Sequence, residues 1–270
     1  MTQARSLTSR DALPLIDQAS GSTIGAKDIK APQMEEINDF VDDRQKSWCV
    51  HCGRFLVDLK SNRDHVPTRT FLHPPYPTNL PVIAVCTECN NGFSKDEQYF
   101  VAFLSSVISG TTEPNAQLSP AAERILRDNE RLRARIERSK TEYQTPAGEA
   151  HIVWRPEQDR IDRVIVKNAR GHAFFEFGEP MLDRPARVLS MPLPTLTFDE
   201  RTCFENMPSA VIWPEVGSRM MTRFLTGQDL NGPWVVVQDG LYRYAVTQYG
   251  GGLLVRSVMA EYLGTEVFWG

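Results

Sequence analysis

The residues with the clearest potential for chemistry are cysteines. Four of the five form two Cys-x-x-Cys pairs, Cys49 with Cys52 and Cys86 with Cys89, while Cys203 stands apart. Two such pairs supply four thiolates, which complete a tetrahedral zinc site and leave no position open for water. We therefore predict a structural zinc site that closes a small fold around the segment between the pairs. Cys203 has no partner pattern and is predicted to be a small, buried apolar residue.

The segment between the pairs contains residues suited to acid–base and metal chemistry. It carries Asp64-His65-Val66-Pro67 early and Asn79 late, and Asn90 follows the second pair directly. A histidine with its ordinary pKa of about 6.5 can accept a proton at physiological pH. Asp and Asn offer the hard oxygen ligands that magnesium and manganese prefer. The segment therefore offers a general base and ligands for a hard cation.

This order of residues resembles the HNH endonucleases, whose nuclease unit is the ββα-metal, or His-metal finger, fold. The match covers residues 48 to about 100 and includes both cysteine pairs. The resemblance implies that His65 activates water and that Asn79 braces the loop and the orientation of His65. It also implies that Asp64 and Asn90 hold a catalytic Mg²⁺ or Mn²⁺ ion. The implied reaction is metal-dependent DNA cleavage that leaves a 5′-phosphate and a 3′-hydroxyl, in a family that includes restriction, homing and phage-defence enzymes.

One point of geometry works against this assignment. Adjacent residues on a regular strand point to opposite faces, so Asp64 and His65 enter one site only if the strand bends or ends there. Asn90 stands at a position where the family accepts either Asn or His, and a neutral amide should bind a metal more weakly than an imidazole. Two alternatives stay open: a non-catalytic zinc ribbon that binds nucleic acid or a protein partner, and an RNA-directed enzyme of the same fold.

Two further histidines receive no catalytic role. His51 lies inside the first Cys-x-x-Cys pair and is predicted to be a solvated loop residue, because four thiolates already complete the zinc site. His172 lies far along the chain and is predicted to be structural or at the surface. The role of base stays with His65, as the resemblance implies.

Capping signals and periodicity predict the elements that position these residues. Ser94-Lys95-Asp96-Glu97 has the pattern of a capping box, and a helix with an apolar face is expected from there to Gly110. Ser119-Pro120 is expected to open an Arg-rich helix that runs to about Lys140. Further elements are a strand at 151–154, a helix over 161–175, strands at 188–194 and 196–198, and strands at 234–238, 241–247, 253–259 and 267–269.

These elements group into four segments of an α+β chain. They are a flexible N-terminal arm at 1–46 with one helix over 32–44, an HNH nuclease domain at 47–110, a loop and Arg-rich helical connector at 111–147, and a C-terminal α+β domain at 148–270. The predicted fold class is therefore a zinc-stapled ββα-metal module followed by a mixed α+β domain. The arm and the C-terminal domain are the candidates for contact with a protein partner.

Charge and hydropathy limit the remaining function classes. The net charge of −4 argues against indiscriminate coating of nucleic acid. Local phosphate contacts are predicted instead from Lys95 and Arg69 beside the HNH residues, and from Arg131 and Arg135 in the Arg-rich helix. No stretch approaches the run of about 18 apolar residues that a membrane span needs, so no membrane partner is expected. Paired cysteines without a secretory signal favour the reducing cytoplasm.

Overall fold

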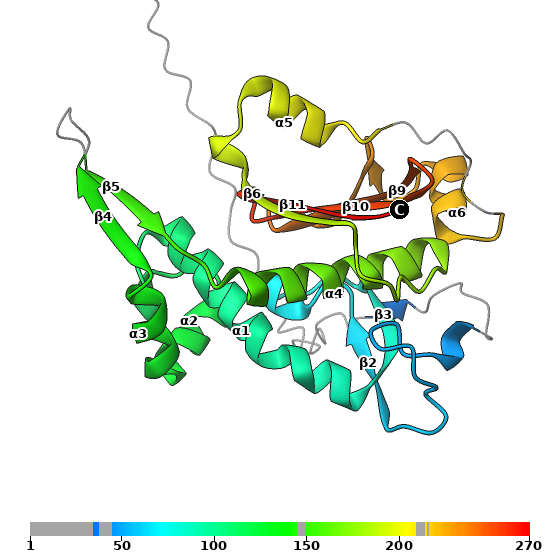
Figure 1. The fold of residues 1–270 in the computed structure, drawn as a ribbon, viewed down its shortest axis with the longest axis horizontal. Coiled ribbons are helices and arrows are strands. Elements are labelled where there is room, and N and C mark those ends of the chain that lie inside the picture. The colour runs from blue at the N-terminus through cyan, green and yellow to red at the C-terminus, as the bar shows by residue number, and fades with distance from the viewer. Residues whose placement is uncertain (1–34, 38–44, 145–149, 209–213, 215) are drawn as a thin grey trace, which may run out of the picture. The chain divides into compact units, whose positions relative to one another are not determined.

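A long central helix organises the part of the chain that the structure describes. The computed structural model describes residues 35–37, 45–144, 150–208, 214 and 216–270. Residues 34–270 group as one unit. Within this unit, helix α4 (Gln158–Phe177) lies between a six-stranded sheet on one side and the elements that carry the cysteine pairs on the other (Figure 1). The chain is thus mixed α+β, as predicted.

The cysteine-bearing segment forms a small sheet and a helix. Strands β1 (Glu35–Ile37), β2 (Ser61–His65) and β3 (Asn79–Cys86) form a three-stranded sheet in the order β1-β3-β2. β2 and β3 are antiparallel, and helix α1 (Thr87–Ser109) follows β3 directly. We call β2, β3 and α1 the ββα unit. The helix expected over 32–44 is not formed at β1, and the rest of that range lies outside the described residues, as does nearly all of the predicted arm.

Helix α1 begins earlier than its predicted capping box. Cys86 is the N-cap, and its Sγ accepts a hydrogen bond from the backbone N–H of Cys89. Ser94 and Glu97 therefore lie in the interior of the helix, because the cysteine turn caps the backbone first. The C-terminus is as predicted, since Gly110 adopts a left-handed conformation with φ of 72°.

The Arg-rich segment is two helices where one was predicted. Ser119 caps α2 (Pro120–Asp128) as expected by accepting from the backbone N–H of Ala122. Asn129 then interrupts the helix, and its side chain caps α3 (Glu130–Glu137). The break follows from the preference of Asn for cap positions over helix interiors.

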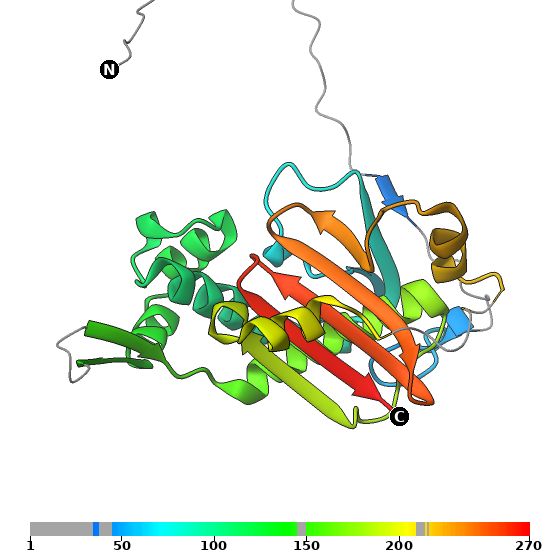
Figure 2. The same cartoon turned by 90° about the horizontal axis from the view of Figure 1, so that it is seen from above.

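The six-stranded sheet is antiparallel throughout and has the order β6-β11-β10-β9-β8-β7 (Figure 2). Its strands are β6 (Arg187–Pro192), β7 (Leu230–Asn231), β8 (Trp234–Gln238), β9 (Tyr242–Tyr249), β10 (Gly252–Met259) and β11 (Leu263–Trp269). The other elements are the hairpin β4 (Lys140–Gln144) and β5 (Ala150–Trp154), helix α6 (Arg219–Thr226), and the short 3-10 helices η1 (Gln45–Ser47), η2 (Arg69–Phe71), η3 (Pro114–Ala116) and η4 (Leu193–Thr195). The strands predicted after residue 234 are confirmed.

Helix α5 (Phe198–Glu205) replaces the strand expected at residues 196–198. The Thr197 hydroxyl accepts from the backbone N–H of Glu200, and the Glu200 carboxylate accepts in return from the Thr197 N–H, which completes a capping box. Cys203 lies on this helix and is exposed, so the prediction of a buried cysteine is wrong.

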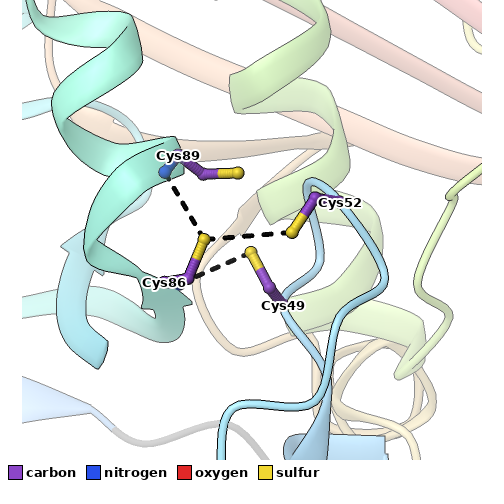
Figure 3. Close-up of side chains that lie close together, drawn as sticks. All are labelled: Cys49, Cys52, Cys86 and Cys89. Atoms are coloured by element: carbon purple, nitrogen blue, oxygen red, sulfur yellow. Dashed lines mark hydrogen bonds between the residues drawn. The ribbon is translucent and has the colours of Figure 1, made fainter. Parts of the chain in front are cut away.

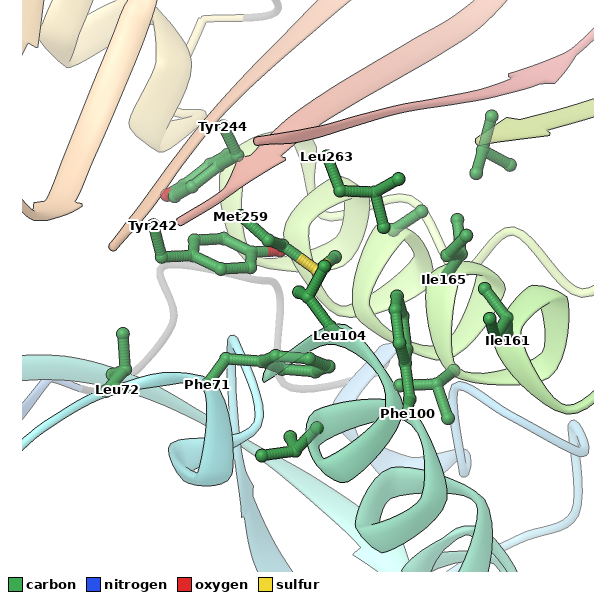
Figure 4. Close-up of a cluster of buried hydrophobic side chains, with 14 of the residues drawn as sticks. Phe71, Leu72, Phe100, Leu104, Ile161, Ile165, Tyr242, Tyr244, Met259 and Leu263 are labelled. Carbon is green, nitrogen blue, oxygen red and sulfur yellow. The ribbon is translucent and has the colours of Figure 1, made fainter. Parts of the chain in front are cut away.

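One apolar core joins the ββα unit to the six-stranded sheet. Phe71 and Phe100 pack against Ile165 of α4 and against Tyr242 and Met259 of the sheet (Figure 4). This core crosses the predicted segment boundaries at residues 110 and 147. A second cluster lies beneath α5 and contains Leu193, Phe204, Trp234, Ala245 and Val258. Among the described residues, no helix combines the length and the apolar character that a membrane span requires.

His172 occupies a structural position inside this core. Its ring stacks on Tyr244 with 3.7 Å between ring centres, and Nε2 lies 3.0 Å from the Tyr242 hydroxyl. Complete burial, together with the positive charge of Arg223, lowers the pKa of His172 to about 3. The neutral imidazole is therefore the form that the fold accepts.

Acid should destabilise the protein through His172. The unfolded imidazole binds a proton below a pKa of about 6.5 and the folded one does not, so stability is complete above that pH and is lost as the pH falls toward 3. We expect a loss of about 2 kcal/mol in the free energy of unfolding between about pH 7.5 and pH 5 from this residue. Urea unfolding of wild-type and His172→Gln protein at both pH values measures this loss. The contributions of other titrating groups cancel when the two proteins are compared. Parallel pH profiles for the two proteins would contradict the expectation.

Candidate metal centre and nuclease site

The two cysteine pairs converge on one point of the structure. Cys49 and Cys52 lie in a turn after η1, and Cys86 and Cys89 lie at the junction of β3 with α1 (Figure 3). Their four Sγ atoms lie within 4.8 Å of one another, and Cys52 Sγ is 3.8 Å from Cys86 Sγ. Four Zn–S bonds of about 2.3 Å in a tetrahedron place the sulfurs about 3.8 Å apart. The cluster can therefore hold a zinc ion with four protein ligands.

Hydrogen-bond donors surround these sulfurs. The backbone N–H of Cys86 donates to Cys49 Sγ at 3.4 Å, and that of Cys89 donates to Cys86 Sγ at the same distance. Arg54 Nε donates to Cys52 Sγ at 3.4 Å. Burial acts to raise the pKa of Cys52, but the hydrogen bonds from Arg54 outweigh it and lower the pKa to about 6. The surroundings of Cys52 thus favour its thiolate, the form that binds a metal, whereas burial raises the pKa of Cys49 and of Cys89.

The ββα unit carries the predicted catalytic residues at its joints. His65 is the last residue of β2, where it pairs with Val82 of β3, and Asn90 lies near the start of α1. Both side chains are half-buried. Asn79 is the first residue of β3, and its side chain lies outside the described part of the structure.

Asp64 is buried on the side of the sheet that faces α4. Its Oδ1 and Oδ2 lie 3.1 Å and 3.0 Å from Lys167 Nζ. Burial acts to raise the pKa of Asp64, but the contacts with His51 and Lys167 outweigh it and hold the pKa below its usual range. By strand alternation, His65 lies on the opposite face. Asp64 is therefore engaged by a protein cation and not by solvent.

His51 is buried, so the prediction of a solvated loop residue is wrong. Its Nε2 lies 3.7 Å from Asp64 Oδ2, and its ring packs edge-on against Phe93 with 5.0 Å between centres. The turn that directs the two cysteines toward one ion also directs His51 into the interior. Burial lowers the pKa of His51, which favours its neutral form.

The surroundings of Asp64 do not fit a catalytic magnesium or manganese ion in this arrangement. Both of its carboxylate oxygens face the ammonium of Lys167, and a second cation at the same oxygens would meet like charge. Over the described ranges, the four cysteines are the group of His, Cys, Asp or Glu side chains that is placed to hold a metal. A divalent ion at Asp64 therefore requires a different position of Lys167.

The four residues predicted to contact phosphates come from three separate elements. Lys95 is exposed on α1, and Arg69 is exposed in η2 with its guanidinium 5.7 Å from the centre of the Tyr76 ring. Arg131 is exposed on α3. Arg135, on the same helix, is engaged by the Glu157 carboxylate at 2.5 Å. Such exposed ion pairs are weak, so they leave a basic residue available to phosphate.

A row of basic residues on α4 escaped the sequence analysis. Arg160, Arg163, Lys167 and Arg170 are spaced along one face of the helix, which faces α1 and the cysteine turn. Arg160 and Arg163 each donate to Asp96 at 2.6 Å, and Arg170 donates to the carbonyl of His51 at 3.1 Å. The helical spacing of these four basic residues is a signal readable in the sequence, and the apolar periodicity that predicts the helix over 161–175 does not contain it.

Comparison with known proteins supplies no family for this chain. No family model, no curated protein and no solved structure matches it. The functional assignment therefore rests on the residues and the geometry described above.

Proposed function

We propose that this protein is an HNH-type endonuclease, a metal-dependent hydrolase of DNA phosphodiester bonds. One observation carries the proposal: a four-cysteine cluster closes a strand-strand-helix unit that has His65 at the end of β2 and Asn90 near the start of α1. The order of these elements and residues is the order that the HNH resemblance implies.

His65 supplies the base in the proposed reaction. The half-buried imidazole accepts a proton from a water molecule, whose oxygen attacks phosphorus. The bond from phosphorus to O3′ breaks, which leaves a 5′-phosphate and a 3′-hydroxyl, and O3′ takes a proton from solvent. A Mg²⁺ or Mn²⁺ ion would neutralise the phosphate charge, as the resemblance implies.

Exposed basic residues support a nucleic acid as the substrate, and both DNA and RNA fit this chemistry. Lys95, Arg69 and Arg131 are exposed and provide local positive charge, although the net charge of the chain is −4. In the experiment, supercoiled plasmid and a structured RNA are each incubated with the full-length protein, with Mg²⁺, with Mn²⁺ and with neither. We expect cleavage of the plasmid that depends on the divalent ion. Binding without cleavage under all three conditions would sink the proposal.

The second candidate is a non-catalytic zinc ribbon that binds nucleic acid or a protein partner. One observation favours this candidate. Both carboxylate oxygens of Asp64, the acidic residue of the motif, contact the Lys167 ammonium. Such a protein needs zinc but no second ion, so omission of Mg²⁺ would leave its affinity for DNA unchanged in a gel-shift titration.

A further inference from the structure

The ammonium of Lys167 lies in a cage of oxygen atoms between α4 and the ββα unit. Nζ lies 3.0 Å from Asp64 Oδ2, 2.8 Å from Thr68 Oγ1 and 2.5 Å from Glu97 Oε1. The Lys167 side chain is only 2% exposed. An ammonium has three N–H donors, and these three oxygens satisfy them all. Its charge is matched by two carboxylates, one from β2 and one from α1.

Close packing fixes the distance between α4 and the end of β2, and with it the position of Lys167. A Cβ added at Gly171 would lie 2.7 Å from Val66 Cγ2, so a larger residue there would push the helix away from the end of β2. The neighbouring Asn168 Oδ1 accepts from the backbone N–H of Thr68 at 3.2 Å and from its hydroxyl at 3.1 Å. Helix α4 is thus held to the loop after β2 at two points next to the cage.

The oxygens of this cage are of the type that a divalent ion would use. Carboxylates and a hydroxyl are hard ligands suited to Mg²⁺ or Mn²⁺. Asp64 is also the acidic residue of the HNH-like motif, so the protein cation and the ion that the resemblance implies need the same oxygens. Two cations at one carboxylate repel each other, and occupation by one weakens binding of the other.

We propose that Lys167 is a built-in cation that competes with the divalent ion for Asp64 and Glu97, so that α4 restrains the nuclease unit. The regulatory role of this contact rests on the proposed function, because Lys167 can restrain hydrolysis only if the protein is a nuclease. The competition itself is a property of the cage. Binding of the ion requires Lys167 to leave, and the lost contacts lower the affinity for the ion.

Manganese binding tests the competition without any cleavage assay. Mn²⁺ is titrated into zinc-loaded, full-length protein, and free Mn²⁺ is measured by electron paramagnetic resonance. We expect the Lys167→Met variant to bind Mn²⁺ about tenfold or more tightly than wild-type. The double variant Asp64→Asn, Lys167→Met should lose that gain. Arg163→Met is the matched control, because Arg163 lies on the same face of α4 but contacts Asp96 and is largely exposed.

Equal Mn²⁺ affinity in wild-type and Lys167→Met protein would overturn the proposal, and so would a gain that survives Asp64→Asn. Removing Lys167 leaves two facing carboxylates and can prevent folding. In that case Lys167→Gln, which keeps a hydrogen-bond donor, is compared with and without Mn²⁺ by thermal unfolding. We expect Mn²⁺ to raise its midpoint by several degrees more than that of wild-type. Failure of Mn²⁺ to stabilise the variant would also overturn the proposal, whereas a protein that never cleaves DNA can still give the expected result.

Discussion

Replacing Cys86 with serine is expected to release the zinc ion and to lower the free energy of unfolding by several kcal/mol. Cys86 is buried where β3 passes into α1, its Sγ caps the first turn of the helix, and its backbone N–H donates to Cys49 Sγ. Structural zinc contributes about 10–16 kcal/mol to folding in small zinc-finger peptides, so loss of one of four ligands removes much of the support for the ββα unit. Elemental zinc analysis and thermal unfolding measure the two effects.

Cys203→Ser is the matched control for this experiment. It is the same substitution at the exposed cysteine on α5, outside the four-cysteine cluster. Its effect on the free energy of unfolding should lie within about 0.5 kcal/mol, with full zinc content. Equal zinc content in the two variants would contradict the four-cysteine site.

Removal of the Glu176 carboxylate should cost about 3–5 kcal/mol of stability. Glu176 is fully buried on α4 and accepts hydrogen bonds from Arg223 Nε at 3.1 Å and from the Tyr244 hydroxyl at 2.5 Å. Arg223 is itself buried, at 6% exposed, and in Glu176→Ala its guanidinium keeps the ion pair with Asp229 as its one carboxylate partner among the described residues. The cost comes from leaving a buried charge poorly compensated. Urea unfolding at neutral pH measures it.

Glu123→Ala supplies the comparison for Glu176. Glu123 forms an ion pair with Arg127 one turn away on α2, and the Arg127 side chain is largely exposed. Pairs of this kind contribute about 0.3–0.5 kcal/mol. Losses of similar size in the free energy of unfolding of Glu123→Ala and Glu176→Ala would contradict the importance of the buried pair between Glu176 and Arg223.

Local patterns predicted the parts of the fold that local interactions determine. The Cys-x-x-Cys spacing, the Ser119 cap and the stop at Gly110 each involve residues a few positions apart, and all three are present in the structure. Errors arose where two local signals competed. The capping-box pattern at Ser94 predicts a later start for α1, whereas the helix begins at the cap formed by Cys86 in the cysteine turn.

The surroundings of Asp64 were beyond reach of the sequence for a physical reason. Lys167 is separated from Asp64 by 103 positions, and their contact depends on how α4 packs against the ββα unit. Strand alternation predicts that Asp64 and His65 face different sides of β2, and in the structure Asp64 is buried while His65 is half-buried. Alternation could not show which partner each residue contacts, because the sequence of β2 carries no information about the packing of α4 against this strand.

The rate of plasmid cleavage by wild-type and His65→Ala protein tests the proposed nuclease function most directly. Both proteins are compared at neutral pH with Mg²⁺ and with Mn²⁺, after zinc content and the thermal midpoint have shown that both are folded. The proposed function predicts that loss of the base slows cleavage by about 10²- to 10⁴-fold. An unchanged rate in His65→Ala protein would contradict the assignment of His65 as the base and, with it, the proposed function of the ββα unit.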